Sequence, residues 1–295
     1  MKNQRMLGNI LLLSAALIWG TSFFILKNTL DAVPVCGLLG VRFTVGFVLL
    51  SIIFHKKWRQ LNRKLLGHGV LCGVLLGAAY VVQTFGLSGT TPGKNAFLTA
   101  VYCVLTPFVW WLIFRKRPSG RNWIAAVMCL GGIGLVSLDG DLSMSAGDAL
   151  TLCSGLLYAL HIVAVSHYGR SGDDPVVLTN LQFATSAVIC WVLSAMTEAW
   201  PSAVPGQAWL ALGYLSVMCT TVAMLLQNLG QSMTTASSAA ILLSLESVFG
   251  VLFSVLFAGE RPTVRLIIGF AVIFAAVLVS ELQGAKPVEK QEQLQ

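Results

Sequence analysis

Hydrophobic residues form ten long runs along this chain, and short polar segments separate the runs. They lie at 8–27, 34–54, 68–87, 95–114, 121–138, 147–168, 175–197, 207–226, 235–257 and 263–283. Each approaches the ~20 residues that cross the hydrocarbon layer of a membrane as a helix. Backbone groups in hydrocarbon have no water to bond with, so each run is expected to be an α-helix. The pattern predicts an all-α integral membrane protein with ten transmembrane helices.

The runs divide into two sets of five that resemble each other. Residues 86–98 align with 230–242 with six identities in thirteen, including a shared Thr-Thr pair. The same offset places Arg117–Pro118 on Arg261–Pro262. The sequence therefore predicts two repeats, 1–140 and 141–295, of which the second ends in a short polar tail.

An odd number of spans in each repeat has a consequence for topology. With five spans each, the second repeat starts on the opposite side of the membrane and inserts upside down. With a small gap, Arg42–Phe43 falls on Gln182–Phe183. Inverted repeats are typical of alternating-access carriers, whose substrate site lies near the midplane between the halves. The alternative is a duplicated membrane protein with another function.

Basic residues gather on one side of the predicted topology. If the N-terminus is cytoplasmic, fourteen of the nineteen lie in cytoplasmic segments: Lys2, Arg5, Lys56, Lys57, Arg59, Arg63, Lys64, Arg115, Lys116, Arg117, Arg121, Arg170, Lys286 and Lys290. Four lie on the other side, Lys27, Lys94, Arg261 and Arg265, and Arg42 is inside a span. This bias follows the positive-inside rule and predicts that both termini are cytoplasmic. It accounts for the net charge of +7 without nucleic acid as a partner, and the basic loops are expected to meet anionic lipids.

Composition excludes most soluble classes of protein. Apolar residues make up 56% of the chain and charged residues 11%, against ~25% charged in soluble proteins. The first run is longer than the apolar core of a signal peptide and lacks a clear cleavage site, so it is interpreted as an uncleaved helix. Seven scattered cysteines have no metal-ligand spacing, and no phosphate-binding glycine loop is present. The sequence predicts neither a metal site nor a cofactor.

Three ionisable residues sit well inside the predicted spans: Arg42, His161 and Glu246. A charge at the bilayer centre costs at least ~2.5 kcal/mol, so such residues usually face the interior of the bundle and serve a site. Arg42 and Glu246 lie at similar depth and could form a structural ion pair. Alternatively, Arg42 receives a substrate anion and Glu246 an amine or a proton. His161 is interpreted as a residue that forms a hydrogen bond between helices rather than as a proton relay.

Further polar residues could line a cavity. The proposed cavity residues are Trp19, Arg42, Tyr80, Gln83, Asn95, Thr99, Tyr102, Tyr158, His161, Gln227 and Glu246. Thr84, Thr106 and Asn228 are other polar residues that could line a cavity. Trp19 lies near mid-span, where wall and packing roles are both open. Pro107 lies inside the fourth span, where it removes a backbone donor and is expected to kink the helix.

Together these features resemble the EamA type of the drug/metabolite transporter superfamily. The resemblance covers about 8–283 and rests on Trp19–Gly20, Arg42–Phe43, the stretch GLSGTTPGKNAFLTAVYCVLTPFVWWLIF and its second copy GQSMTTASSAAILLSLESVFGVLFSVLFAGERP. Leu245–Glu246 and Gly259–Glu260–Arg261 stand where the family has them. The chain has Ser247 where the family often has Pro, and Arg115–Lys116–Arg117 in place of a Gly-Glu pair.

The resemblance implies a multi-pass carrier of the inner (plasma) membrane. Some members of the superfamily are similar to exporters of amino acids and related metabolites, and other members carry nucleotide sugars or sugar phosphates. We therefore expect a secondary transporter of a small polar metabolite, working as a monomer or a homodimer. Efflux of a lipophilic cation is an alternative, which Arg42 would oppose. A membrane-embedded enzyme or a receptor is a further alternative, but the spans hold no paired Asp and no Ser or Asp motif matching His161.

Overall fold

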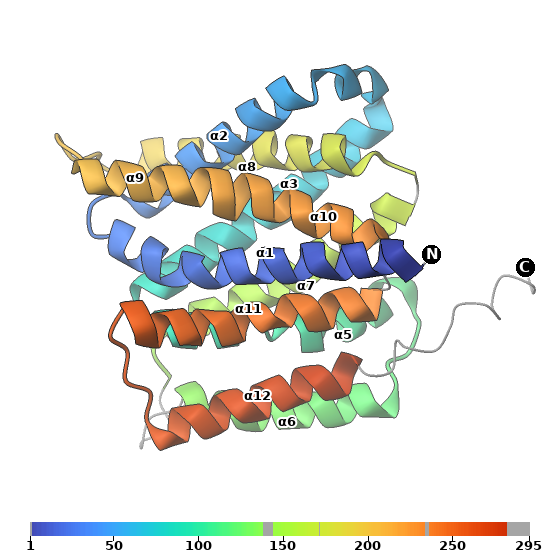
Figure 1. Ribbon diagram of the computed structural model, residues 1–295, viewed down its shortest axis with the longest axis vertical. Helices are drawn as coiled ribbons and strands as arrows, with labels where there is room; N and C mark the ends of the chain where they lie inside the picture. Colours follow the sequence, from blue (N-terminus) through green and yellow to red (C-terminus); the bar gives the residue numbers. More distant parts are fainter. Residues whose placement is uncertain (1, 138–143, 171, 234–235, 282–295) are drawn as a thin grey trace, which may run out of the picture.

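The computed structural model describes residues 2–137, 144–170, 172–233 and 236–281. These residues are helical apart from short connections (Figure 1). The helices are α1 (Lys2–Thr29), α2 (Val35–Ile53), the 3₁₀ helix η1 (His55–Gln60), α3 (Arg63–Ser88), α4 (Pro92–Thr99), α5 (Tyr102–Phe114), α6 (Gly120–Ser137), α7 (Ala146–Arg170), α8 (Pro175–Thr197), α9 (Gly206–Tyr214), the π-helix η2 (Leu215–Val222), α10 (Ala223–Met233), α11 (Ala236–Phe257) and α12 (Val264–Glu281).

Seven helical segments are long and apolar enough to cross a membrane by length and composition. They are Met6–Thr29, Val35–Ile53, Arg63–Ser88, Pro92–Phe114, Ala146–Gly169, Pro175–Thr197 and Gly206–Gly230. Three shorter apolar helices, Gly120–Val136, Leu242–Phe257 and Val264–Val279, coincide with the remaining predicted runs. The chain is therefore a multi-helix membrane protein.

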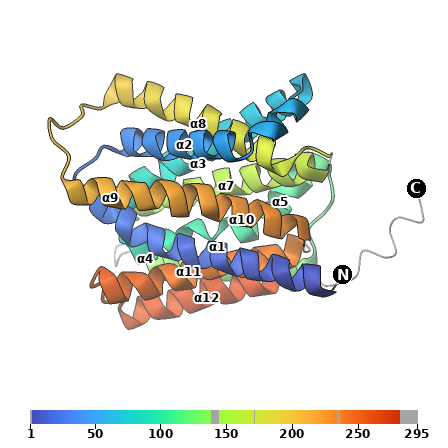
Figure 2. The ribbon, with the colours of Figure 1, turned by 45° about the horizontal axis from the view of Figure 1, so that its top comes forward.

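The helices lie side by side as one bundle (Figures 1 and 2). At one end of the stack α2 packs on α8, and at the other end α6 packs on α12. Between them, α1 packs against α10 and α11, while α7 packs against α3, α4 and α5. The start of α1 and the end of α12 lie at the same edge of the bundle, at the right of Figure 1.

Glycines allow several of these helices to approach closely. A Cβ on Gly20 of α1 would lie 2.4 Å from the Cβ of Phe249 in α11. A Cβ on Gly69 of α3 would lie 2.4 Å from that of Leu181 in α8. Small residues at such crossings let apolar helices gain packing contacts in lipid. Helix spacing is therefore set by these positions.

Two of the predicted spans are irregular. The fourth is divided into α4 and α5 by a turn at Ala100–Val101, where backbone hydrogen bonds shift to a three-residue spacing. Pro107 lies inside α5, beyond this interruption, and the kink expected at Pro107 itself stays a prediction. The eighth span contains the π-helix η2, and such segments are frequent at functional sites.

Side-chain caps fix the starts of two helices. Ser145 accepts a hydrogen bond from the backbone N–H of Asp148 at 3.0 Å, which caps α7. Asp174 accepts from the backbone N–H groups of Val176 and Val177, with Pro175 in the first turn of α8. The predicted boundary between the repeats falls largely on 138–143, outside the described residues, and so does the polar tail after 281.

Candidate functional site

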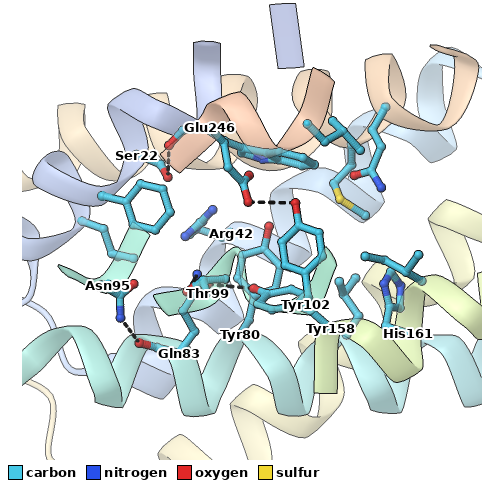
Figure 3. A pocket seen from close by; sticks show the side chains of 18 residues that line it. Ser22, Arg42, Tyr80, Gln83, Asn95, Thr99, Tyr102, Tyr158, His161 and Glu246 are labelled. Atoms are coloured by element: carbon cyan, nitrogen blue, oxygen red, sulfur yellow. Dashed lines mark hydrogen bonds between the residues drawn. The ribbon is translucent and has the colours of Figure 1, made fainter. Parts of the chain in front are cut away.

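A polar cavity lies inside the bundle, between helices from both predicted repeats (Figure 3). It holds about 740 Å³ of space between atoms, part of it open to solvent. Its walls come from α1, α2, α3, α4, α5, α7, α10 and α11. The lining residues are Trp19, Ser22, Phe23, Leu26, Arg42, Leu76, Tyr80, Gln83, Asn95, Thr99, Tyr102, Tyr158, His161, Ile162, Met224, Gln227, Leu243 and Glu246.

All eleven cavity candidates from the sequence are among these residues. Thr84, Thr106 and Asn228, which could also have lined a cavity, are not among them. Thr84 and Thr106 donate to the backbone oxygens of Tyr80 and Tyr102, four residues earlier in the same helices. Asn228 donates to the hydroxyl of Thr179 on α8. Their polar groups are therefore used within and between helices.

The sequence analysis missed the remaining lining residues. Six are apolar, Phe23, Leu26, Leu76, Ile162, Met224 and Leu243, and the seventh is Ser22. In a membrane helix an apolar side chain is equally suited to lipid, to a helix contact or to a cavity. A signal exists for three of the seven. Helical spacing from Trp19 places Ser22, Phe23 and Leu26 along one side of α1.

Arg42 is buried, with 2% of its surface exposed. Its Nε donates to the Thr220 hydroxyl at 2.9 Å, and that hydroxyl donates to the Leu215 carbonyl within η2. The guanidinium lies 5.4 Å from the centre of the Tyr80 ring, a cation–π distance. The π-helix and the aromatic ring together hold the guanidinium in place, with its terminal nitrogens in the cavity (Figure 3).

Glu246 is also buried, at 6% exposure, and accepts a hydrogen bond from the Tyr102 hydroxyl at 3.0 Å. Within the described residues three contacts join basic to acidic side chains: Lys57–Asp174, His68–Asp173 and Lys94–Asp148. The ion pair between Arg42 and Glu246 that depth allowed is not among them. The cavity therefore holds a cation and a carboxyl group that are not bonded to each other.

An amide and hydroxyl network forms one wall of the cavity. The Tyr158 hydroxyl donates to Gln83 Oε1 at 2.7 Å, and Gln83 Nε2 donates to the Thr99 hydroxyl at 3.0 Å. Asn95 Nδ2 donates to the Thr151 hydroxyl at 2.8 Å and to the backbone oxygen of Gln83 at 3.3 Å. The network joins α3, α4 and α7 and fixes the amides that face the cavity.

His161 and Trp19 brace the cavity from two sides. His161 Nε2 lies 2.6 Å from Gln182 Oε1, and Gln182 Nε2 donates to the Leu178 carbonyl, so the histidine is the donor. This contact joins α7 to α8, as expected for a hydrogen bond between helices. The Trp19 indole donates to the Cys219 carbonyl in η2 at 2.8 Å. Trp19 is therefore both a wall of the cavity and a support of the π-helix.

Polar contacts also tie the helix ends. Lys27 Nζ, next to the lining residue Leu26, donates to the carbonyls of Leu87, Ser88 and Thr90 at 2.8, 2.8 and 3.1 Å. At the start of α8, Lys57 Nζ lies 2.7 Å from Asp174 Oδ2. Burial alone would raise the pKa of Asp174, but the hydrogen bond from Lys57 and those from the backbone of Val177 and Val176 outweigh it and lower this pKa.

Long apolar helices surround a buried cavity, an arrangement expected of a membrane transport protein, and comparison with known proteins agrees. The model of the EamA-like transporter family matches residues 6–138 and again 145–282. The chain therefore belongs to the EamA-like transporter family, within the drug/metabolite transporter superfamily.

Relatives and a solved structure match most of the chain. An uncharacterized transporter of Archaeoglobus fulgidus is 32% identical over 286 residues, covering 94% of this chain and 87% of the relative. The uncharacterized inner membrane transporter YedA of Escherichia coli K12 is 23% identical, covering 92% and 91%. A crystal structure with 18% identity superposes with a TM-score of 0.68 over 94% of this chain and 97% of that chain.

Proposed function

We propose that this protein is a secondary carrier of the inner membrane that exports amino acids or related polar metabolites by alternating access. The observation that carries the proposal is the pair of buried groups in the cavity. Arg42 offers terminal N–H donors and Glu246 offers a carboxyl group, and the two groups are not bonded to each other. An amino acid has the matching carboxylate and ammonium. Arginine binds carboxylates through two parallel hydrogen bonds.

The proposed architecture is ten transmembrane helices in two inverted repeats, 1–140 and 141–295. Two contacts support it. Tyr102 bonds Glu246, and these residues are 144 positions apart, the offset that aligns 86–98 with 230–242. Phe43 and Phe183, which the alignment also pairs, lie with ring centroids 5.9 Å apart. Contacts between equivalent residues are expected near a two-fold axis that relates the halves.

Helix packing supports the same relationship. With α7 equivalent to α1, and α4 and α5 equivalent to α11, the contact of α1 with α11 corresponds to that of α7 with α4 and α5. The contact of α1 with α10 likewise corresponds to that of α7 with α3. In this proposal both termini are cytoplasmic, which agrees with the charge bias and with the shared edge of α1 and α12.

Efflux of a lipophilic cation is the competing function. The aromatic residues Trp19, Tyr80, Tyr102 and Tyr158 around Glu246 suit a cation. The fixed Arg42 guanidinium in the same cavity repels one, and the amides of Gln83, Asn95 and Gln227 suit a polar solute better. A carrier also leaves its solute chemically unchanged, which separates this proposal from an intramembrane enzyme.

Flux into proteoliposomes tests the proposal. Purified protein is reconstituted, and uptake of labelled amino acids, of a lipophilic cation such as tetraphenylphosphonium, and of a sugar phosphate is measured against protein-free vesicles. We expect saturable flux of amino acids, with the label recovered chemically unaltered. Saturable flux of the cation alone would establish the competing function, and altered label would establish an enzyme.

A further inference from the structure

Asn95 has one side-chain atom whose bonding is incomplete. The residue is fully buried on α4 and lines the cavity. Its Oδ1 is a buried side-chain acceptor without a hydrogen-bond partner, a state that among the described residues is shared only with Oδ1 of Asn180. A buried carbonyl left unpaired is costly, so an atom of this kind on a residue that lines a cavity points to a ligand donor.

The orientation of the Asn95 amide is set by its neighbours. The Thr151 hydroxyl gives its proton to the Gly147 carbonyl, so it can only accept from Asn95. The second partner, the backbone oxygen of Gln83, also only accepts. Both contacts therefore require the amino group on this side, and turning the amide over would lose them. The oxygen is left on the other side.

Neighbouring side chains do not supply the missing donor. Gln83 Nε2 is used by Thr99, and the Tyr158 hydroxyl is used by Gln83 Oε1. Arg42 and Glu246 lie further along the cavity, with the guanidinium between Glu246 and Asn95 in Figure 3. A substrate carboxylate at Arg42 and an ammonium at Glu246 thus leave Asn95 facing a different part of the substrate.

Resting on the proposed function, we propose that Asn95 is a specificity-determining residue that accepts a hydrogen bond from an O–H or N–H group of the substrate side chain. The substrate class is then amino acids whose side chain carries a donor, such as a hydroxyl, an amide or an indole. A site that bonds a polar group rejects the analogue that lacks it, because its own buried atom then stays unpaired. Apolar amino acids of the same shape are the disfavoured class.

Matched competitors test this inference. Uptake of a labelled amino acid by proteoliposomes is measured with unlabelled competitors added in matched pairs, of which the first member carries a side-chain donor and the second does not. The pairs are threonine and valine, tyrosine and phenylalanine, and tryptophan and naphthylalanine. We expect wild-type protein to favour the donor-bearing member of at least one pair by about tenfold in half-maximal concentration, the ratio that one buried hydrogen bond gives. Equal inhibition within every pair would overturn the inference.

Two variants complete the test. Asn95→Leu keeps the size of the side chain and removes the acceptor, so the preference within the pair should disappear. Asn180→Leu is the matched control, since it removes the other unpaired buried oxygen at a position that does not line the cavity, and it should keep the preference. A preference retained in Asn95→Leu contradicts the inference. If Asn95→Leu does not fold, the wild-type comparison decides alone.

The outcome also separates this inference from the proposed function. Absence of saturable amino acid flux in wild-type vesicles would remove the proposed function and the inference with it. Saturable flux with equal inhibition within every pair would remove only the role of Asn95.

Discussion

The Tyr102 hydroxyl donates to Glu246 Oε1 at 3.0 Å, and the two residues occupy equivalent positions in the two predicted repeats, 144 residues apart. The contact therefore lies where the two halves of the chain meet. It also joins two walls of the cavity, from α5 and α11. Experiments on the inverted arrangement of the repeats therefore also bear on the location of the proposed site.

Topology is the first prediction. With ten spans and a cytoplasmic N-terminus, a reporter that is active only in the periplasm should be silent when fused after Gln295. A reporter that fluoresces only in the cytoplasm should be bright at the same position. High periplasmic activity would contradict the proposed span number or the orientation.

Close packing of α1 on α11 gives the second prediction. Gly20→Ala places a Cβ within 2.4 Å of the Phe249 Cβ, so it should destabilise the fold by about 1–3 kcal/mol, as overpacking does. Gly131→Ala is the control, because a Cβ there would have no atom of another helix within 4 Å. Thermal denaturation in detergent measures both variants. Equal melting temperatures would refute this packing.

The start of α8 gives the third prediction. Asp174→Ala removes both the helix cap and the partner of Lys57, and should cost about 1 kcal/mol or more. Asp174→Asn keeps a good cap and loses only the charge, so its melting temperature should fall less. If Asp174→Asn is as unstable as Asp174→Ala, the ion pair rather than the cap is the main contribution.

The same carboxylate has a pH dependence with a definite sign. Its pKa is lower in the folded protein than in the unfolded chain, where it is ~3.9. The stability that it contributes is thus complete above that unfolded value and is lost as the pH falls through the lower folded pKa. The difference in melting temperature between wild type and Asp174→Asn should be constant near neutral pH and shrink below about pH 4. A difference that grows on acidification would contradict the sign.

Much of the cavity follows from sequence because polar groups at membrane depth have few alternatives to an interior site. Arg42, Glu246 and Asn95 were expected at a cavity on this ground, and they line one. Depth along a helix does not give rotation about it, and for this reason the sequence could not show that Tyr102, rather than Arg42, bonds Glu246. Their role in substrate binding remains a proposal.

Other features have no signal in a single sequence. The turn at Ala100–Val101 and the π-helix η2 depend on which carbonyl each backbone N–H reaches after packing. Apolar lining residues such as Phe23 and Met224 look the same whether they face lipid, a helix or a cavity. The family resemblance, by contrast, was predicted from motifs spread over nearly the whole chain and is confirmed by the match to both halves.

Transport by Arg42→Gln, compared with wild type at equal amounts of folded protein in proteoliposomes, tests the central claim most directly. Because Arg42 is bonded to Thr220 and lies over Tyr80 instead of neutralising Glu246, we expect the variant to fold. Its half-saturating amino acid concentration should rise about tenfold or more, since a charged hydrogen-bond pair with the carboxylate is lost. Gly131→Ala, prepared in the same way, should transport like wild type. If Arg42→Gln showed the flux and the half-saturating concentration of wild type, a substrate-binding role for Arg42 would be contradicted.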